Sequence, residues 1–228
     1  MTASVAPHRW FVSGRPTPFA GGENERNWKL ALREQSVAPI DEQGQTHLEV
    51  RFALAGARIS QSGSDLDNLI EPVVSVLVNG LGWAGGRRPN LQEIAAGKRS
   101  ADIEGVQIAF GAAAATWSSL LLDEVLLDDI YGGPLPRSAT EPEFAEWVVS
   151  HMVGPLNGRP AAVRLWFSDS ATNLGEIATG RSKPLIDCLW PVLGGRPGAP
   201  DDWRIQDLVV RKSGLNHSGV AVFVATAR

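Results

Sequence analysis

The sequence predicts an α/β protein built from two diverged copies of one unit. Two short runs of strand type, residues 47–54 and 160–167, each carry a Val-Arg pair. Two amphipathic stretches, one around Trp28 and one around Trp147, each follow a turn that contains two prolines. The features recur in the same order about half the chain apart, which indicates an internal duplication.

Each copy is predicted to run strand, proline turn, helix, strand, loop, helix, strand, strand. The first turn and helix precede the Val-Arg strand. The second helix carries Glu71-Pro72 in one copy and Lys183-Pro184 at the matching place in the other, and a glycine stops each one. We therefore expect matching helices at matching places in the two copies.

The closing strands complete the repeat. Matching segments lead to Lys98 in the first copy and to Lys212 in the second, and each is followed by one more strand. The join falls within residues 111–119. We therefore expect two tandem units, residues 1–114 and 115–228, each a small mixed sheet with two helices. We expect these units to pair about an approximate twofold axis, as closed homodimers do.

Composition indicates an ordinary globular protein, with 43% hydrophobic and 20% charged residues. The net charge of −4 argues against broad nonspecific binding to nucleic acid, so any DNA contact must be local. Cys188 is the single cysteine, so an internal disulfide is excluded. No apolar run reaches the roughly 20 residues that a spanning helix needs. We expect a cytoplasmic protein with no membrane partner.

Two aspartates, Asp65 and Asp67, stand where a predicted helix begins. Side chains at i and i+2 on an extended approach point to the same side, so both carboxylates can reach one cation. Mg²⁺ suits such a pair, because it takes one or two carboxylates and completes its shell with water and substrate phosphate. The alternative is that Asp67 only caps the helix. Either way, we expect both carboxylates to be exposed.

The run Asp65-Leu66-Asp67-Asn68-Leu69, followed by Pro72 and apolar residues, resembles the signature helix of RusA-type Holliday junction resolvases. The second copy resembles the continuation of that pattern, with Asp201-Asp202 and a basic strand end at residues 211–212. The resemblance covers most of the chain. It implies a pseudo-dimer that cuts branched DNA with clustered aspartates and Mg²⁺, assisted by a lysine on the signature helix.

Neither copy holds the whole family set. The first copy has Glu71 in place of the family lysine, and Arg87 and Arg88 in place of the paired aspartates. The second copy keeps Lys183 and Asp202 but lacks the Asp-x-Asp-Asn run. These complementary losses permit one composite site or none. For a composite site, the resemblance implies four catalytic residues: Asp65, Asp67, Asp202 and Lys183. The three aspartates among them would also bind the metal.

The leading hypothesis is a structure-specific DNA endonuclease that acts on branched or structured DNA as a monomeric pseudo-dimer. It would use Mg²⁺, with Mn²⁺ as a substitute, at a single or impaired site. The alternative is a catalytically inactive RusA-like module that binds DNA or protein. Polar side chains flanking the signature helices are the expected DNA contacts, unless they are merely solvated. They are Asn68, Arg87, Arg88, Lys98, Arg99, Arg211 and Lys212.

Overall fold

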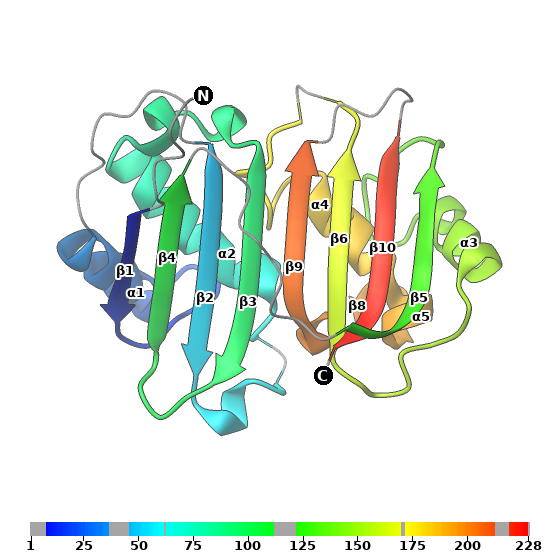
Figure 1. Ribbon diagram of the computed structural model, residues 1–228, viewed down its shortest axis with the longest axis horizontal. Coiled ribbons are helices and arrows are strands. Elements are labelled where there is room, and N and C mark those ends of the chain that lie inside the picture. The colour runs from blue at the N-terminus through cyan, green and yellow to red at the C-terminus, as the bar shows by residue number, and fades with distance from the viewer. Residues whose placement is uncertain are drawn as a thin grey trace, which may run out of the picture.

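One eight-stranded mixed sheet runs through the molecule, and the longer helices lie behind it (Figure 1). This is a computed structural model, which describes residues 8–36, 46–61, 63–111, 122–169, 172–212 and 219–227. The strands of the large sheet are β1 His8–Ser13, β2 His47–Leu54, β3 Glu93–Ser100, β4 Gly105–Gly111, β5 Leu122–Tyr131, β6 Ala161–Phe167, β9 Ile205–Lys212 and β10 Val220–Ala227. A separate two-stranded ribbon is formed by β7 Gly195–Arg196 and β8 Ala199–Pro200.

The strand order is β1-β4-β2-β3-β9-β6-β10-β5. In the first half, β1 pairs with β4 and β4 with β2 antiparallel, while β2 pairs with β3 in parallel. In the second half, β5 pairs with β10 and β10 with β6 antiparallel, while β6 pairs with β9 in parallel. The four strands of each half thus follow the same pairing pattern, and both sequences of pairs end at the centre of the sheet.

The expectation of a separate small sheet in each unit is wrong. The strands β3 and β9 pair antiparallel, from Glu93 opposite Arg211 to Gly97 opposite Asp207, so the two sets of strands form one continuous sheet. Each of these strands would otherwise be an edge with unpaired backbone groups, which the pairing satisfies. The join between the two copies was predicted within residues 111–119, with the boundary at residue 114. Except for Gly111, these residues lie outside the described part of the chain.

The helices are α1 Glu23–Gln35, α2 Leu66–Val74, α3 Pro142–His151, α4 Ser182–Asp187 and α5 Trp190–Leu193. A π-helical segment, Ser75–Gly80, continues α2. Helix α1 is amphipathic and buries Trp28 and Leu32. Helix α2 has buried residues on almost every side, because it packs beneath β3 of its own half and β9 of the other. Throughout the described ranges, every helix is too short or too polar to span a bilayer.

On the sheet face opposite Lys98, an ion pair joins the two halves. Arg51 of β2 reaches across β3 to Asp207 of β9, with Nη1 2.9 Å from Oδ1. Gly97 of β3 lies between them, and a Cβ there would be only 2.7 Å from Arg51 Nη1. Burial raises the pKa of Asp207 to about 7, although the Arg51 charge opposes that shift. The acid is therefore partly protonated at neutral pH.

We expect the Asp207→Asn variant to gain stability relative to wild type as the pH rises from about 5 to 8. At pH values between about 3.9, the pKa of an aspartate in the unfolded chain, and about 7, the pKa of Asp207 in the folded protein, Asp207 binds more protons in the native state than in the unfolded state. Stability from this group is thus present at low pH and lost as the pH passes the folded pKa, with an upper limit on the order of 4 kcal/mol. Urea denaturation across this range measures the difference, and a pH-independent difference would contradict the assignment.

Candidate functional site

An ammonium group from the second half contacts carboxylates from both halves. The Lys183 Nζ atom lies 3.1 Å from Asp67 Oδ2, 3.1 Å from Asp202 Oδ2 and 2.8 Å from Asp187 Oδ1. Asp67 belongs to α2 of the first half, whereas the other three residues belong to the second half. The structure therefore brings together three of the four side chains that the resemblance implies for a composite site.

Local structure explains how these side chains meet. Asp65 has an extended backbone at the N-cap of α2, and Asp67 follows in the first turn. Lys183 and Asp187 are four residues apart on α4, so they share one face of that helix. Asp202 begins a short 3₁₀ turn, Asp202–Arg204, that leads directly into β9. Two helix starts and one strand start thus converge beside the β3–β9 junction.

The fourth predicted residue, Asp65, lies at the edge of this cluster. The Asn68 side-chain amide donates to Asp65 Oδ2 at 3.4 Å, while Asp65 Oδ1 is buried and has no hydrogen-bond partner among the described residues. Burial raises the pKa of Asp65, and the negative charge of Asp202 raises it further. Asn68, which was predicted to contact DNA, is half-buried and contacts the Asp65 carboxylate.

Lys98 is buried and fastens the two loops that carry the aspartates. Its Nζ donates to Ser64 O at 2.9 Å, to Ser64 Oγ at 3.1 Å, and to Trp203 O. Ser64 precedes Asp65 and Trp203 follows Asp202, so one ammonium group ties both loops together. Burial lowers the pKa of Lys98 to about 8. This lysine, predicted to contact DNA, instead positions the acidic residues.

The expectation of an exposed Asp67 is wrong, since its side chain is only 2% exposed. Helix α2 packs beneath the junction of β3 and β9, so its first turn, which contains Asp67, is buried as well. Burial raises the pKa of Asp67 to about 6 against the opposing charge of Lys183. Burial also tends to lower the pKa of Lys183, but the negative charges of Asp67 and Asp202 have the larger effect, so the pKa of this ammonium group is raised.

The oxygen atoms in this cluster are of the kind that Mg²⁺ prefers. Asp65 Oδ1 lacks a partner, and Asp67 Oδ2 lies within ion-pair distance of Lys183 but outside hydrogen-bond geometry. Within the ranges that the structure describes, no three His, Cys, Asp or Glu side chains are already arranged to hold a metal ion. Lys183 lies among the carboxylates instead. Asp65 and Asp67 are the two carboxylates that would hold a magnesium ion here, with water and a substrate phosphate as the remaining ligands.

Comparison with known proteins gives no match. No protein-family model, no curated protein and no solved structure matches this chain significantly. The chemistry of the site is therefore inferred from its own geometry.

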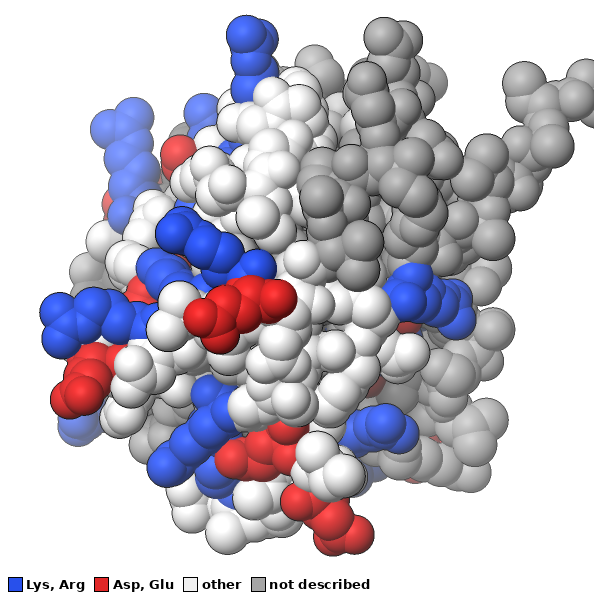
Figure 2. All heavy atoms as spheres, turned by 90° about the vertical axis from the view of Figure 1, so that its left-hand side faces the viewer, with Lys and Arg blue, Asp and Glu red and all other residues white. Residues whose placement is uncertain are grey.

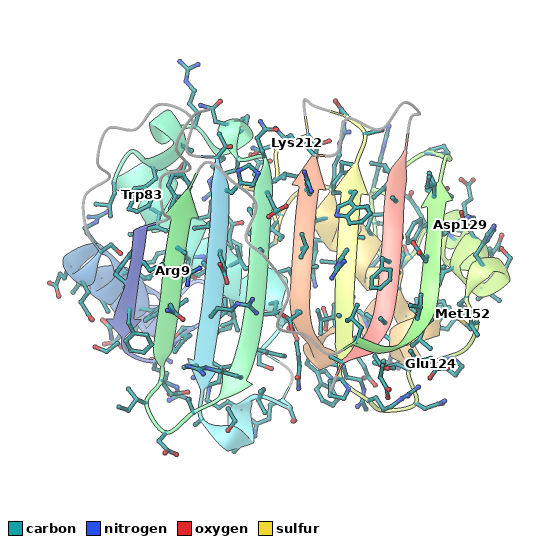
Figure 3. All side chains as sticks on the ribbon, in the orientation of Figure 1. Arg9, Trp83, Glu124, Asp129, Met152 and Lys212 are labelled. Carbon is teal, nitrogen blue, oxygen red and sulfur yellow. The ribbon has the colours of Figure 1, made fainter. Side chains whose placement is uncertain are left out.

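The remaining predicted DNA contacts divide into paired and exposed side chains. Arg88 forms an ion pair with Glu71 and donates to Gly175 O at 2.8 Å. Lys212 stands at the end of β9, next to the first half (Figure 3), and donates to Pro89 O at 2.6 Å. Arg211 lies 3.7 Å from Glu93. Two arginines are exposed: Arg87 on a loop, and Arg99 near the end of β3, where it lines a pocket together with Arg51 and Gly97.

Sequence reasoning missed Asp187 and the role of Lys98. The i, i+4 spacing of Lys183 and Asp187 on a helix was an available signal for the first. Nothing local marked Lys98 as buried, because lysine is rarely buried and polar residues, Arg99 and Ser100, follow it to the end of β3. Two further acidic residues, Glu93 and Asp201, make other contacts: Glu93 with Arg211 and Asp201 with Arg204.

Proposed function

We propose that the chain is a tandem duplication whose two copies form a pseudo-dimer about an approximate twofold axis. The identical pairing pattern in the two sets of four strands supports this, because the central β3–β9 pair is the place where two copies of one sheet would meet. The order of helices is the same in both copies as well. The arrangement resembles a homodimeric RusA-type resolvase made from one chain.

Reciprocal contacts across the junction also support duplication. Lys98 of the first half donates to Trp203 O of the second, and Lys212 of the second half donates to Pro89 O of the first. Each acceptor stands nine residues before the lysine of its own half (98 − 89 and 212 − 203). Two equivalent hydrogen bonds that exchange partners are what an isologous contact requires.

The two copies differ most where each family site should be. Lys183 contacts Asp202 in the second half, and the matching residues of the first half, Glu71 and Arg88, form an ion pair with the charges reversed. A carboxylate paired with an arginine offers neither the aspartates nor the lysine of the family. We infer that one ancestral site became a structural ion pair and that the other became composite.

The activity we propose is Mg²⁺-dependent nicking of branched DNA at this composite site. The convergence of Asp67, Lys183 and Asp202 from opposite halves carries the proposal. Asp65 and Asp67 would hold the metal, which when bound supplies an activated water for attack on a phosphodiester. Lys183 would place a positive charge beside the reacting phosphate, and Lys98 would keep the two aspartate loops in register.

The test is a labelled four-way junction incubated with Mg²⁺ or Mn²⁺ and separated on a denaturing gel. A homodimeric resolvase has two equivalent sites and can cut two strands symmetrically. One composite site should nick one strand, without paired incision, and either metal should support the reaction. Binding should weaken as salt rises, with a slope that reports only a few neutralised phosphates. An intact junction at every metal concentration, while still bound, would contradict the nuclease proposal.

A second candidate function is a noncatalytic module that uses the pseudo-dimer to bind DNA or protein. The position of Lys183 favours it, because the ammonium group forms ion pairs with Asp67, Asp187 and Asp202 and so ties α2 to the second half. For such a module the cluster would serve to hold the two halves together. It predicts binding of the junction without cleavage.

A further inference from the structure

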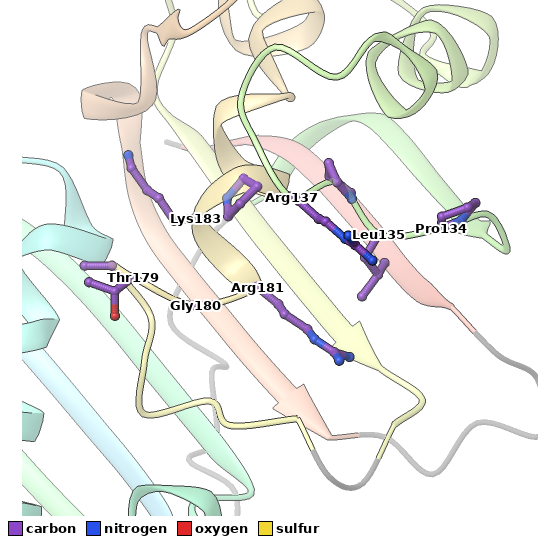
Figure 4. Close-up of a pocket in the computed structure, with 10 residues that line it drawn as sticks. Pro134, Leu135, Arg137, Thr179, Gly180, Arg181 and Lys183 are labelled. Atoms are coloured by element: carbon purple, nitrogen blue, oxygen red, sulfur yellow. The ribbon is translucent and has the colours of Figure 1, made fainter.

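A basic hollow lies beside α4, on the second half of the molecule. It has a volume of about 580 Å³ and lies between the proline turn 134–137 and the segment 178–184 (Figure 4). Three of its lining residues are cationic, namely Arg137, Arg181 and Lys183, and none of the residues that line it is acidic. A hollow with this composition attracts an anion.

The two arginines are available to a ligand in a way that Lys183 is not. Figure 4 shows Arg137 and Arg181 extending to one side of the start of α4, while Lys183 extends to the other side, towards the first half. Arg181 makes an exposed ion pair with Asp169 at 3.2 Å, with side chains 58% and 45% exposed, so solvent screens it. The Arg137 guanidinium has no ion pair within the part of the chain that the structure describes.

The rest of the lining is apolar. Pro134, Leu135, Pro136 and Pro184 form a wall next to the arginines. Guanidinium groups recognise phosphate oxygens in a planar, two-pronged geometry, and an apolar wall suits a sugar or an unstacked base. The combination suits one nucleotide of an unpaired strand.

The first half is built differently at the matching place. Its proline turn is bound directly to the protein, with Phe19 N donating to Asn68 O at 2.8 Å and Arg58 Nη2 donating to Pro16 O at 2.6 Å. In the second half, the hollow separates the turn from the start of α4. The open pocket therefore occurs in the half that keeps Lys183.

We propose that this arginine pocket, formed by Arg137, Arg181 and the stem of Lys183, binds a backbone phosphate of the DNA strand that enters the composite site. The DNA strand would pass over the start of α4. One of its phosphates would contact the two arginines, and the neighbouring nucleotides would lie on the side of α4 where Lys183 points. The choice of DNA as ligand rests on the proposed function, but binding here does not require cleavage. The pocket makes recognition one-sided, since the matching turn of the first half is hydrogen-bonded directly to the protein.

The experiment measures binding of a fluorescent four-way junction by anisotropy in EDTA, so that cleavage cannot occur. The Arg137→Ala/Arg181→Ala double variant should bind at least about 10-fold more weakly, and the magnitude of its salt slope should fall by about 1 to 2. The matched control is Arg26→Ala/Arg33→Ala on α1. That helix lies at the side of the molecule seen in Figure 2, where basic and acidic side chains are interspersed. Both arginines are exposed, and this equal loss of charge should change affinity less than 2-fold.

Two further arms separate the possible outcomes. A deoxynucleoside monophosphate and inorganic phosphate are titrated as competitors, and the proposal predicts that both compete far more weakly than unlabelled junction. Equal competition by the free nucleotide would overturn the proposal of a strand-binding site. Unchanged junction binding by the double variant, or equal weakening by the control, would also overturn the pocket. If the wild type binds the junction through these arginines but never cuts it, only the nuclease proposal fails. If the protein cuts the junction and binding does not depend on the arginines, only the pocket proposal fails.

Discussion

Replacing Lys183 with methionine should lower the free energy of unfolding by about 3–5 kcal/mol at pH 8, because the change leaves buried carboxylates without their shared cation. Methionine retains most of the apolar stem, so lost packing contributes little. The deficit should shrink towards pH 5, where Asp67, with a pKa near 6 in the wild type, takes up a proton instead. Urea denaturation at the two pH values measures both effects.

The control is Lys29→Met on α1. Lys29, whose side chain is 31% exposed, also pairs with a carboxylate four residues away, Glu25, which keeps hydrogen bonds from the Ala20 and Gly21 amides when the lysine is lost. Its loss should cost no more than about 1 kcal/mol. A Lys183 variant that loses no more stability than this control would show that the ammonium group is not the counter-ion of the cluster.

The Asp67→Asn variant should nick a branched substrate at least about 100-fold more slowly while remaining folded. An amide carries no charge with which to hold Mg²⁺, although its carbonyl oxygen can still accept a hydrogen bond from Lys183. Because burial already disfavours the charged form of Asp67, a neutral amide avoids part of that cost, so the fold should survive. Gel assays over a Mg²⁺ series and circular dichroism measure the two properties.

Asp128→Asn, an exposed aspartate on β5, serves as the control and should leave nicking unchanged. If Asp67→Asn lowers the melting temperature strongly but leaves the response to Mg²⁺ intact, Asp67 is structural. Loss of nicking with an unchanged melting temperature supports the ligand role.

Much of the fold could be predicted from the sequence because local patterns determine it. The Val-Arg runs became β2 and β6, and the tryptophan helices and x-Pro helices formed where the patterns predicted. The pairing of β3 with β9 had no such signal, because edge-to-edge contact depends on which strands the folded halves leave exposed. One continuous sheet therefore replaced the two small sheets that local reasoning favoured.

The parts of the site that a short sequence motif marks could be predicted, whereas the parts that depend on tertiary packing could not. Asp65 and Asp67 were visible as a motif at a helix start, and Lys183 and Asp202 followed from a family resemblance. The burial of Asp67 and Lys98 was not visible, because it arises from α2 packing under both halves, a tertiary effect. Complementary losses in the two copies indicated a composite site, and the distances between Asp67, Lys183 and Asp202 are consistent with one.

The most direct test of the composite site is an anomalous difference map from crystals soaked in Mn²⁺. We predict a peak bound to the carboxylates of Asp65 and Asp67, with the Lys183 ammonium group moved away from Asp67. The buried, unpartnered Asp65 Oδ1 should become a ligand at about 2.1 Å. A map without a peak there, with Lys183 still in contact with Asp67 and Asp202, would contradict the metal site and leave the cluster as an internal ion pair.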